Sequence, residues 1–224
     1  CQMGTQWRSG EHYREAVEIV KSGKLGQVRQ VRCWAYLDWI REIGNPPDGP
    51  VPPGVDYDMW LGPAPLRPFN KNRFHFNFRW FWDYAGGLMT DWGVHLINVA
   101  LWAMGPEWPR AVITSGGKYV LRDNSETPDT QITVYEFPSY TLIWEHQVQC
   151  GLGPDRREHG VMFTGADASL IVDTAGWEVF AEPQKKGMVE VRRRAQIGEN
   201  LRVQHVGNWI ECVKTRRQPV EHLE

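Results

Sequence analysis

The sequence has no apolar run long enough to span a bilayer, and its charges nearly cancel. Its 224 residues include 25 Lys and Arg against 27 Asp and Glu, and the pI is about 6.4. Nucleic acids and anionic membranes select strongly basic surfaces, so we expect neither as a partner. We expect a cytoplasmic protein, although the abrupt start at Cys1 leaves a periplasmic or exported location open.

Several chemical motifs are also missing. The four cysteines are scattered without a CxxC pair, which indicates free or buried thiols more than a disulfide framework. The histidines show no HExxH spacing, so we expect no metal site. There is no GxSxG nucleophile elbow, no P-loop and no GxGxxG. The sequence therefore carries no motif for a serine hydrolase or for cradling the phosphates of a nucleotide.

Aromatic residues, in contrast, are abundant, with 12 Trp, 8 Phe and 7 Tyr. Tryptophan presents a large flat apolar surface with one donor, which suits stacking on sugar rings and also suits protein interfaces. Core and interface packing accounts for most of them. Only aromatic residues beside chemically active groups therefore indicate a binding site.

The first third of the chain predicts few regular elements. Cys1 to Arg8 has the pattern of the end of a short strand, and Ser9 can cap a helix from Glu11 to Ser22. A long strand is expected from Leu25 to Ile40. The stretch from Glu42 to Asn72 holds eight of the 15 prolines, which predicts an extended, turn-rich arm without regular pairing.

The second half predicts consecutive short strands joined by tight turns, which is typical of an antiparallel sheet. A terminal amphipathic helix is expected from Asn200 to Thr215, with an apolar stripe formed by Val203, Val206, Trp209, Ile210 and Val213. The strands are expected at Arg110 to Leu121, Asp129 to Phe137, Thr141 to Gln149, Glu158 to Thr164, Ala168 to Asp173, Trp177 to Ala181 and Met188 to Arg194. The fold class is α+β, a large, mostly antiparallel open sheet with helices on one face.

The most informative stretch contains Gly86 and Gly87, followed by apolar residues at helical spacing from Leu88 to Met104. Asp91 and His95 are four residues apart on this helix and share one face. The carboxylate can accept a hydrogen bond from one ring nitrogen, and the other nitrogen can then take a proton from a hydroxyl. A surface or capping pair has the same spacing, so the spacing alone leaves both interpretations open.

The residues just before this helix mix cations with aromatic rings. Arg79 can make directed hydrogen bonds to a polar small molecule, and Trp80, Trp82 and Tyr84 are the aromatic residues nearest to the Asp91 pair. A nucleic-acid patch would need a basic domain around it, which this sequence lacks. We therefore expect these four residues to form the wall of a substrate pocket.

The order of these motifs resembles a known family. GTQWRS, then KSGKLGQVRQV, then WLGPAP, then FRWFWDYAGGLMTDWGVHLINVALWAMG are similar to the C-terminal part of the glucose-fructose oxidoreductase/inositol dehydrogenase (Gfo/Idh/MocA) family. The similarity extends over nearly the whole chain. Its most specific element is the set Gly86, Gly87, Asp91 and His95, supported by the loop from Trp60 to Pro63.

The resemblance implies a two-domain oxidoreductase. Such proteins pair an N-terminal Rossmann domain, which binds NAD or NADP, with a C-terminal α+β domain whose open sheet forms a subunit interface. A sugar or polyol binds between the two domains. By this likeness His95 is the general acid or base and Asp91 its partner, and a homo-oligomer forms through the sheet.

The family's phosphate-binding glycines and its Glu-Lys-Pro motif are not found here. The resemblance therefore implies that residues 1–24 are the end of the cofactor domain, a strand and a helix, and that residues 25–224 are the C-terminal substrate-binding domain. A fragment is favoured over natural loss of the cofactor site. Gln6 and Arg8 are the candidate cofactor contacts, and no cofactor is expected to bind this chain alone.

The expected function is the substrate-binding half of an NAD(P)-dependent oxidoreductase acting on a CH-OH group of a sugar, polyol or related molecule. Two alternatives stay open at the level of sequence. One is a carbohydrate-binding or interaction module without redox chemistry. The other is NAD-assisted glycoside cleavage, which some relatives perform through transient oxidation.

Overall fold

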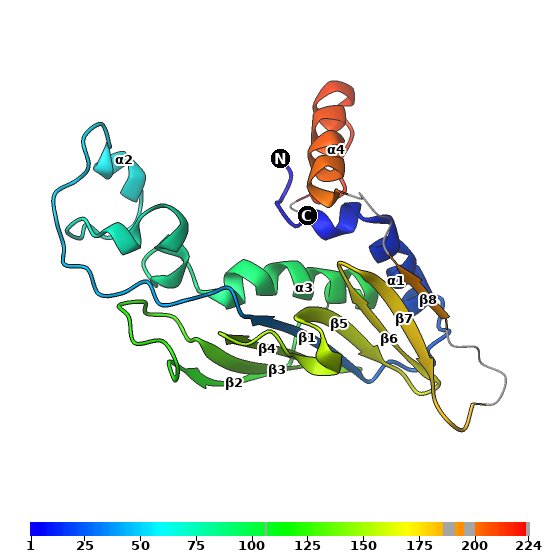
Figure 1. The fold of residues 1–224 in the computed structure, drawn as a ribbon. Helices are drawn as coiled ribbons and strands as arrows, with labels where there is room; N and C mark the ends of the chain where they lie inside the picture. Colours follow the sequence, from blue (N-terminus) through cyan, green and yellow to red (C-terminus); the bar gives the residue numbers. More distant parts are fainter. Residues whose placement is uncertain (106, 186–190, 195–199, 223–224) are drawn as a thin grey trace.

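The fold is built on one eight-stranded sheet with the strand order β2-β3-β4-β1-β5-β6-β7-β8 (Figure 1). The computed structural model describes residues 1–105, 107–185, 191–194 and 200–222. Among neighbouring strands of the described chain, only β1 and β4 run parallel. The strands are β1 Gln30–Leu37, β2 Ala111–Gly117, β3 Thr130–Glu136, β4 Thr141–Val148, β5 His159–Thr164, β6 Ala168–Asp173, β7 Gly176–Ala181 and β8 Val191–Arg194. The mostly antiparallel open sheet is confirmed, and the predicted start of β8 at Met188 lies outside the described residues.

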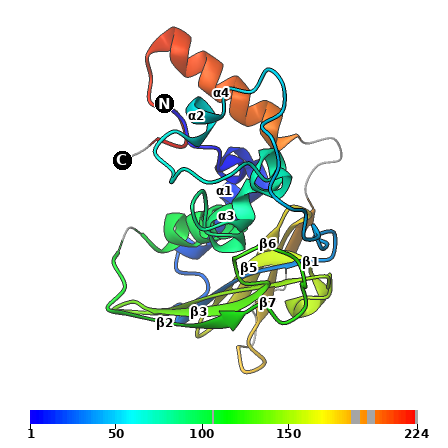
Figure 2. The same ribbon diagram turned by 90° about the vertical axis from the view of Figure 1, so that its left-hand side faces the viewer.

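Two helices, α1 Glu11–Lys21 and α3 Leu88–Met104, lie on the same face of the sheet, whereas α4 Leu201–Thr215 stands away from it (Figures 1 and 2). The proline-rich arm carries α2 Tyr57–Leu61 and projects from the body. Short 3-10 helices complete the chain: η1 Gln6–Ser9, η2 Lys71–Arg73, η3 His75–Trp80 and η4 Pro154–Arg156. Within the described ranges, no helix has both the length and the apolar character needed to cross a membrane.

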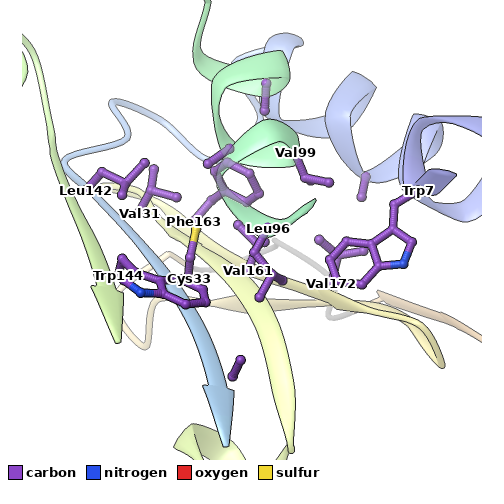
Figure 3. Close-up of a cluster of buried hydrophobic side chains, with 14 of the residues drawn as sticks. Trp7, Val31, Cys33, Leu96, Val99, Leu142, Trp144, Val161, Phe163 and Val172 are labelled. Atoms are coloured by element: carbon purple, nitrogen blue, oxygen red, sulfur yellow. The ribbon is translucent and has the colours of Figure 1, made fainter. Parts of the chain in front are cut away.

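The main core lies between α3 and the centre of the sheet (Figure 3). Alternate residues of a strand point to the same face, and on β1 these are Val31, Cys33, Ala35 and Leu37, all fully buried. Leu96 of α3 is also fully buried. Because α3 is packed this tightly, the backbone that carries Asp91 and His95 is rigidly placed.

The glycine pair in front of α3 has a physical cause. Gly87 is the N-cap residue and has φ of 64°, a left-handed conformation that favours glycine. A Cβ on Gly87 would lie 2.6 Å from side-chain atoms of Thr127, so there is also no room for a side chain. The N–H of Gly87 donates to the carbonyl of Arg79 at 3.0 Å. This turn fixes η3 against the start of α3.

No helix of the described residues covers the opposite face of the sheet, which mixes apolar and charged groups. Ile113 and Ile132 are 72% and 47% exposed there. Arg32 and Glu145 form an ion pair at 2.8 Å on neighbouring strands. The homo-oligomer through this face stays a prediction.

The N-terminal segment differs from its prediction. Cys1 to Arg8 does not form a strand; the described chain has η1 there, and the N–H of Met3 donates to the carbonyl of Glu221. Ser9 does not cap α1, which begins after Gly10, because its hydroxyl is hydrogen-bonded to Nδ1 of His205 at 2.8 Å. Since α1 packs on α3, β6 and β7, it belongs to the same core as the sheet, and the division at residue 24 stays a prediction.

The terminal helix runs from Leu201 to Thr215, one residue shorter than predicted, and Asn200 caps it by accepting from the N–H groups of Arg202 and Val203. The apolar stripe is not packed on the sheet. All five of its side chains are between 43% and 66% exposed, and the buried residue of α4 is His205. The helical spacing predicted the helix correctly, and the described chain leaves its apolar stripe exposed.

Candidate active site

Asp91 and His95 open onto a cavity of about 630 Å³. The cavity lies where η1, α1, the first half of α3, the β6–β7 turn and the start of α4 meet. Its walls therefore come from segments spread over the whole chain. The lining residues are Gln6, Trp7, His12, Asp91, Trp92, His95, Thr174, Asn200, Leu201 and Arg202.

Trp7 is the aromatic centre of this cavity. Its ring stacks on Tyr13 with centroids 5.5 Å apart and on His159 with centroids 5.7 Å apart. The ring of His95 lies 5.3 Å from it, tilted by 42°. Trp92, which is only half-buried, meets Trp7 edge-on at 6.1 Å. Trp7 is only 5% exposed, so Trp92 is the more accessible aromatic surface for a ligand.

The surroundings of His95 favour its neutral form. Burial lowers its pKa, because a charged ring is poorly solvated there; Asp91 opposes this effect and His205 adds to it. Its Nδ1 is buried and has no hydrogen-bond partner in the described part of the chain. Nε2 is the nitrogen left to meet a ligand in the cavity. A neutral imidazole that opens onto a cavity can accept a proton from a hydroxyl.

Asp91 is oriented differently from its prediction. The expected hydrogen bond from a ring nitrogen of His95 to this carboxylate is not formed in the structure. Oδ2 of Asp91 lies 3.4 Å from Nε of Arg79 instead. The carboxylate still favours the charged form of His95 through space, but its closest charged neighbour is the guanidinium of Arg79.

Arg79 does not line the cavity. Its Nη1 donates to the carbonyl of Phe76 at 2.7 Å, and its guanidinium lies 4.0 Å from the centre of the Phe76 ring. The 3-10 geometry of η3 folds the side chain back over its own segment. A direct contact between Arg79 and a ligand in this cavity is therefore not supported.

The three aromatic residues predicted as a substrate wall are not brought to the cavity either. Trp80 is buried in the hydrophobic core at 7% exposure, and Trp82 is 58% exposed away from the cavity lining. Tyr84 packs edge-on against Trp60 with centroids 5.1 Å apart. The prediction treated sequence neighbours of Asp91 as spatial neighbours, whereas the turn at Gly87 directs these rings elsewhere.

The two candidate cofactor contacts have different positions. Gln6 lines the cavity. Nε of Arg8 donates to Oδ1 of Asn98 at 2.9 Å and lies 2.8 Å from Oε1 of Glu221, so its charge is already paired. No glycine-rich phosphate cradle accompanies them. The described residues therefore do not fit a complete nicotinamide cofactor, and they include no group of three side chains suited to a metal ion.

Residues that the sequence did not reveal form most of the cavity wall. Trp92 could have been found, because it follows Asp91 directly on the same helix. Thr174 could not, since it lies in the β6–β7 turn and gains meaning only through its 3.2 Å contact with Nε2 of His159. His12 and Arg202 likewise come from helices that meet only in the folded chain.

Two family models match the chain, at residues 13–112 and 64–218, and both are described as "Oxidoreductase family, C-terminal alpha/beta domain". Among curated proteins, no sequence match is found. Solved structures are similar in fold. An aldose-aldose oxidoreductase from Caulobacter crescentus, complexed with glycerol, is 20% identical with a TM-score of 0.62, over 98% of this chain and 55% of its own.

A levoglucosan dehydrogenase in complex with NADH and levoglucosan is 12% identical, with a TM-score of 0.63 over 95% of this chain and 56% of its own. An inositol dehydrogenase homolog from Azotobacter vinelandii, complexed with NADH and myo-inositol, is 14% identical, with a TM-score of 0.54 over 88% and 43%. The chain thus spans about half the length of these structures. At these identities the likeness shows the fold, whereas the second family match extends over more than half of the chain. The chain belongs to the Gfo/Idh/MocA oxidoreductase family and corresponds to its C-terminal alpha/beta domain.

Proposed function

We propose that this chain is the substrate-binding half of an NAD(P)-dependent oxidoreductase that acts on a CH-OH group of a sugar, polyol or related molecule. One observation carries the proposal. His95, kept neutral by burial, opens together with Asp91 onto the 630 Å³ cavity of a domain whose family is oxidoreductase. A secondary alcohol needs such a base, because its oxidation removes a proton from oxygen and a hydride from carbon.

His95 is the residue that handles the proton. With the substrate hydroxyl next to Nε2, the neutral ring takes the hydroxyl proton as the carbinol carbon becomes a carbonyl, and it returns a proton in the reverse direction. The negative charge of Asp91 stabilises the resulting imidazolium. NAD(P), which accepts the hydride in such oxidations, has no complete site among the described residues, so it would be held by a part of the protein outside this chain.

The cavity lining favours a polyhydroxylated substrate. Trp92 offers a half-buried aromatic face, against which the apolar side of a sugar ring can pack. Thr174, Gln6 and Asn200 place hydroxyl and amide groups around it. The relatives described above were solved with glycerol, levoglucosan and myo-inositol, all of them polyols or sugars.

Binding of NAD(H) and NADP(H) is the first test, measured by calorimetry on this chain and on the product of the complete reading frame. We expect only a longer protein to bind. If the complete reading frame is no longer than this chain and binds neither nucleotide, the redox proposal fails, and the cavity is then treated as a non-redox carbohydrate site.

His95→Ala tests the acid/base assignment in the protein that binds the cofactor. Turnover with the best substrate from a screen of sugars and polyols should fall about 100-fold or more, since general acid–base catalysis contributes on this scale. Cofactor affinity should stay nearly unchanged. His222→Gln replaces an exposed histidine outside the cavity and is the matched control. Full turnover in His95→Ala would remove His95 from the mechanism.

A further inference from the structure

The carboxylate of Asp91 has two cationic or potentially cationic neighbours. One is the guanidinium of Arg79, with Nε at 3.4 Å from Oδ2. The other is the imidazole of His95, one helical turn further along α3, whose Nδ1 is buried and has no hydrogen-bond partner among the described residues. A carboxylate oriented toward one of them is less available to the other.

Arg79 is itself firmly held. It bonds to the carbonyl of Phe76 and lies over the Phe76 ring, and the Gly87 N–H binds its own carbonyl. Its side chain is only 21% exposed, which limits screening of its charge by water. The position of the guanidinium beside the start of α3 is therefore built into the turn that begins the helix.

We infer that Arg79 is a positioning residue, which holds the Asp91 carboxylate away from Nδ1 of His95 when the cavity contains no ligand. It acts on His95 through Asp91 and does not touch a ligand in the cavity. This assignment replaces the substrate contact that the sequence suggested. It explains why an Asp and a His at i and i+4 on one helix face are not hydrogen-bonded to each other.

The consequence is a less basic His95. A free carboxylate at i−4 would favour the imidazolium, whereas a carboxylate paired with a guanidinium favours it less. The pKa of His95 is lowered by its burial, and Asp91 offsets this only in part. Among the described residues, other titratable or charged groups around this site include His12 from α1, His159 from β5, and His205 and Arg202 from α4.

The test is a pH titration of His95 in this chain, followed by the NMR signal of its ring Cε1–H and assigned by its loss in His95→Gln. Arg79→Gln removes the guanidinium charge, so the pKa of His95 should rise by about half a unit or more. Arg79→Met, which keeps an unbranched stem over Phe76, should give the same rise. Arg79→Lys keeps the positive charge, so the pKa of His95 should change less in this variant than in the two neutral ones.

A double-mutant cycle with Asp91→Asn separates this role from a direct effect of the Arg79 charge on His95. In the Asp91→Asn background, Arg79→Gln should no longer raise the pKa of His95. An equal rise in both backgrounds would show that the guanidinium acts directly and would overturn the inference. An unchanged pKa in folded Arg79→Gln would overturn it as well.

If both neutral variants of Arg79 unfold, Asp91→Asn decides alone. If Arg79 weakens the pull of the Asp91 carboxylate on His95, Asp91→Asn should lower the pKa of His95 only slightly; a fall of about one unit or more contradicts the inference. The catalytic meaning of Arg79 rests on the proposed function. The titration uses neither cofactor nor substrate, so its failure is distinguishable from a failure of the oxidoreductase proposal.

Discussion

The helices α3 and α4 have nearly the same length and both carry apolar residues at helical spacing, yet only α3 packs its apolar face on the sheet. The apolar face of α3 is pressed on β1, β4 and β5, with Leu96 and Val99 fully buried. The apolar stripe of α4 is exposed along the helix, and among the described helices and strands α4 contacts mainly η1. The two helices meet the same cavity, one through its first half and the other through its first turn.

This difference shows what an amphipathic pattern does and does not establish. The pattern fixes the period of the backbone and hence the helix itself. What covers the apolar face depends on which surface the chain folds against it, and this is a tertiary property. In α3 the sheet supplies that surface; for α4 no described residue of this chain covers the stripe. Stability should therefore depend strongly on α3 and weakly on α4.

Leu96→Ala, on α3, should lower the unfolding free energy strongly. The side chain is fully buried between α3 and the sheet, so its truncation leaves a cavity and should cost about 2–5 kcal/mol of unfolding free energy. Chemical denaturation followed by circular dichroism measures it. Ile210→Ala on the exposed stripe of α4 is the matched control and should cost far less.

An equal loss of stability in Leu96→Ala and Ile210→Ala would contradict the difference between the helices. In that case the α4 stripe would be covered in solution by something that the isolated chain does not show.

The elements that could be predicted from the sequence are those whose signal is local. The bounds of α3 follow from apolar spacing after the glycine pair, and the hairpin strands follow from alternation between turn residues. The strand predicted at the N-terminus failed because a strand needs a neighbour to pair with. Met3 finds the carbonyl of Glu221 and not a sheet edge, and no local pattern contains that information.

The candidate site was predictable in its chemistry but not in its walls. Asp91 and His95 share one helix face, so their spacing alone places both at the same cavity. Trp80 and Trp82 also lie near Asp91 in the sequence, but the turn at Gly87 separates them from the cavity. Thr174 is far away in sequence and arrives through the topology of the sheet. Local periodicity cannot report such contacts.

Acid should lower the free energy of unfolding through His146 on β4, one of the strands against which α3 packs. Its Nε2 donates to the carbonyl of Pro128 at 3.1 Å, and burial lowers its pKa from 6.5 to about 4. Between these values the unfolded chain binds a proton that the folded chain does not, so stability is lost as the pH falls from 6.5 toward 4. The loss is at most about 3–4 kcal/mol. Denaturation at a series of pH values measures it.

His146→Gln is the informative variant, because glutamine can still donate to Pro128 but does not titrate. Its stability should fall less steeply between pH 6.5 and 4 than that of wild type. His222→Gln, at an exposed position, is the control and should leave the slope unchanged. The same slope in His146→Gln as in wild type would assign the acid sensitivity to other groups. On α4, both ring nitrogens of the buried His205 have hydrogen-bond partners, the hydroxyl of Ser9 and the carbonyl of Met3.

Trp209→Ser on α4 should have the smallest effect on the unfolding free energy, and it tests directly whether the α4 stripe is exposed. The ring is 48% exposed, so its loss should change the unfolding free energy by about 0.5 kcal/mol or less. Trp144→Ser, at a fully buried tryptophan of β4 next to Gly93 of α3, is the matched variant and should cost about 3–5 kcal/mol. If Trp209→Ser instead costs several kcal/mol, and the cost grows with protein concentration, a second copy of the chain covers the α4 stripe. The contrast between the two helices would then hold for the isolated chain and not for the assembly, because association would give α4 the apolar surface that the sheet gives α3.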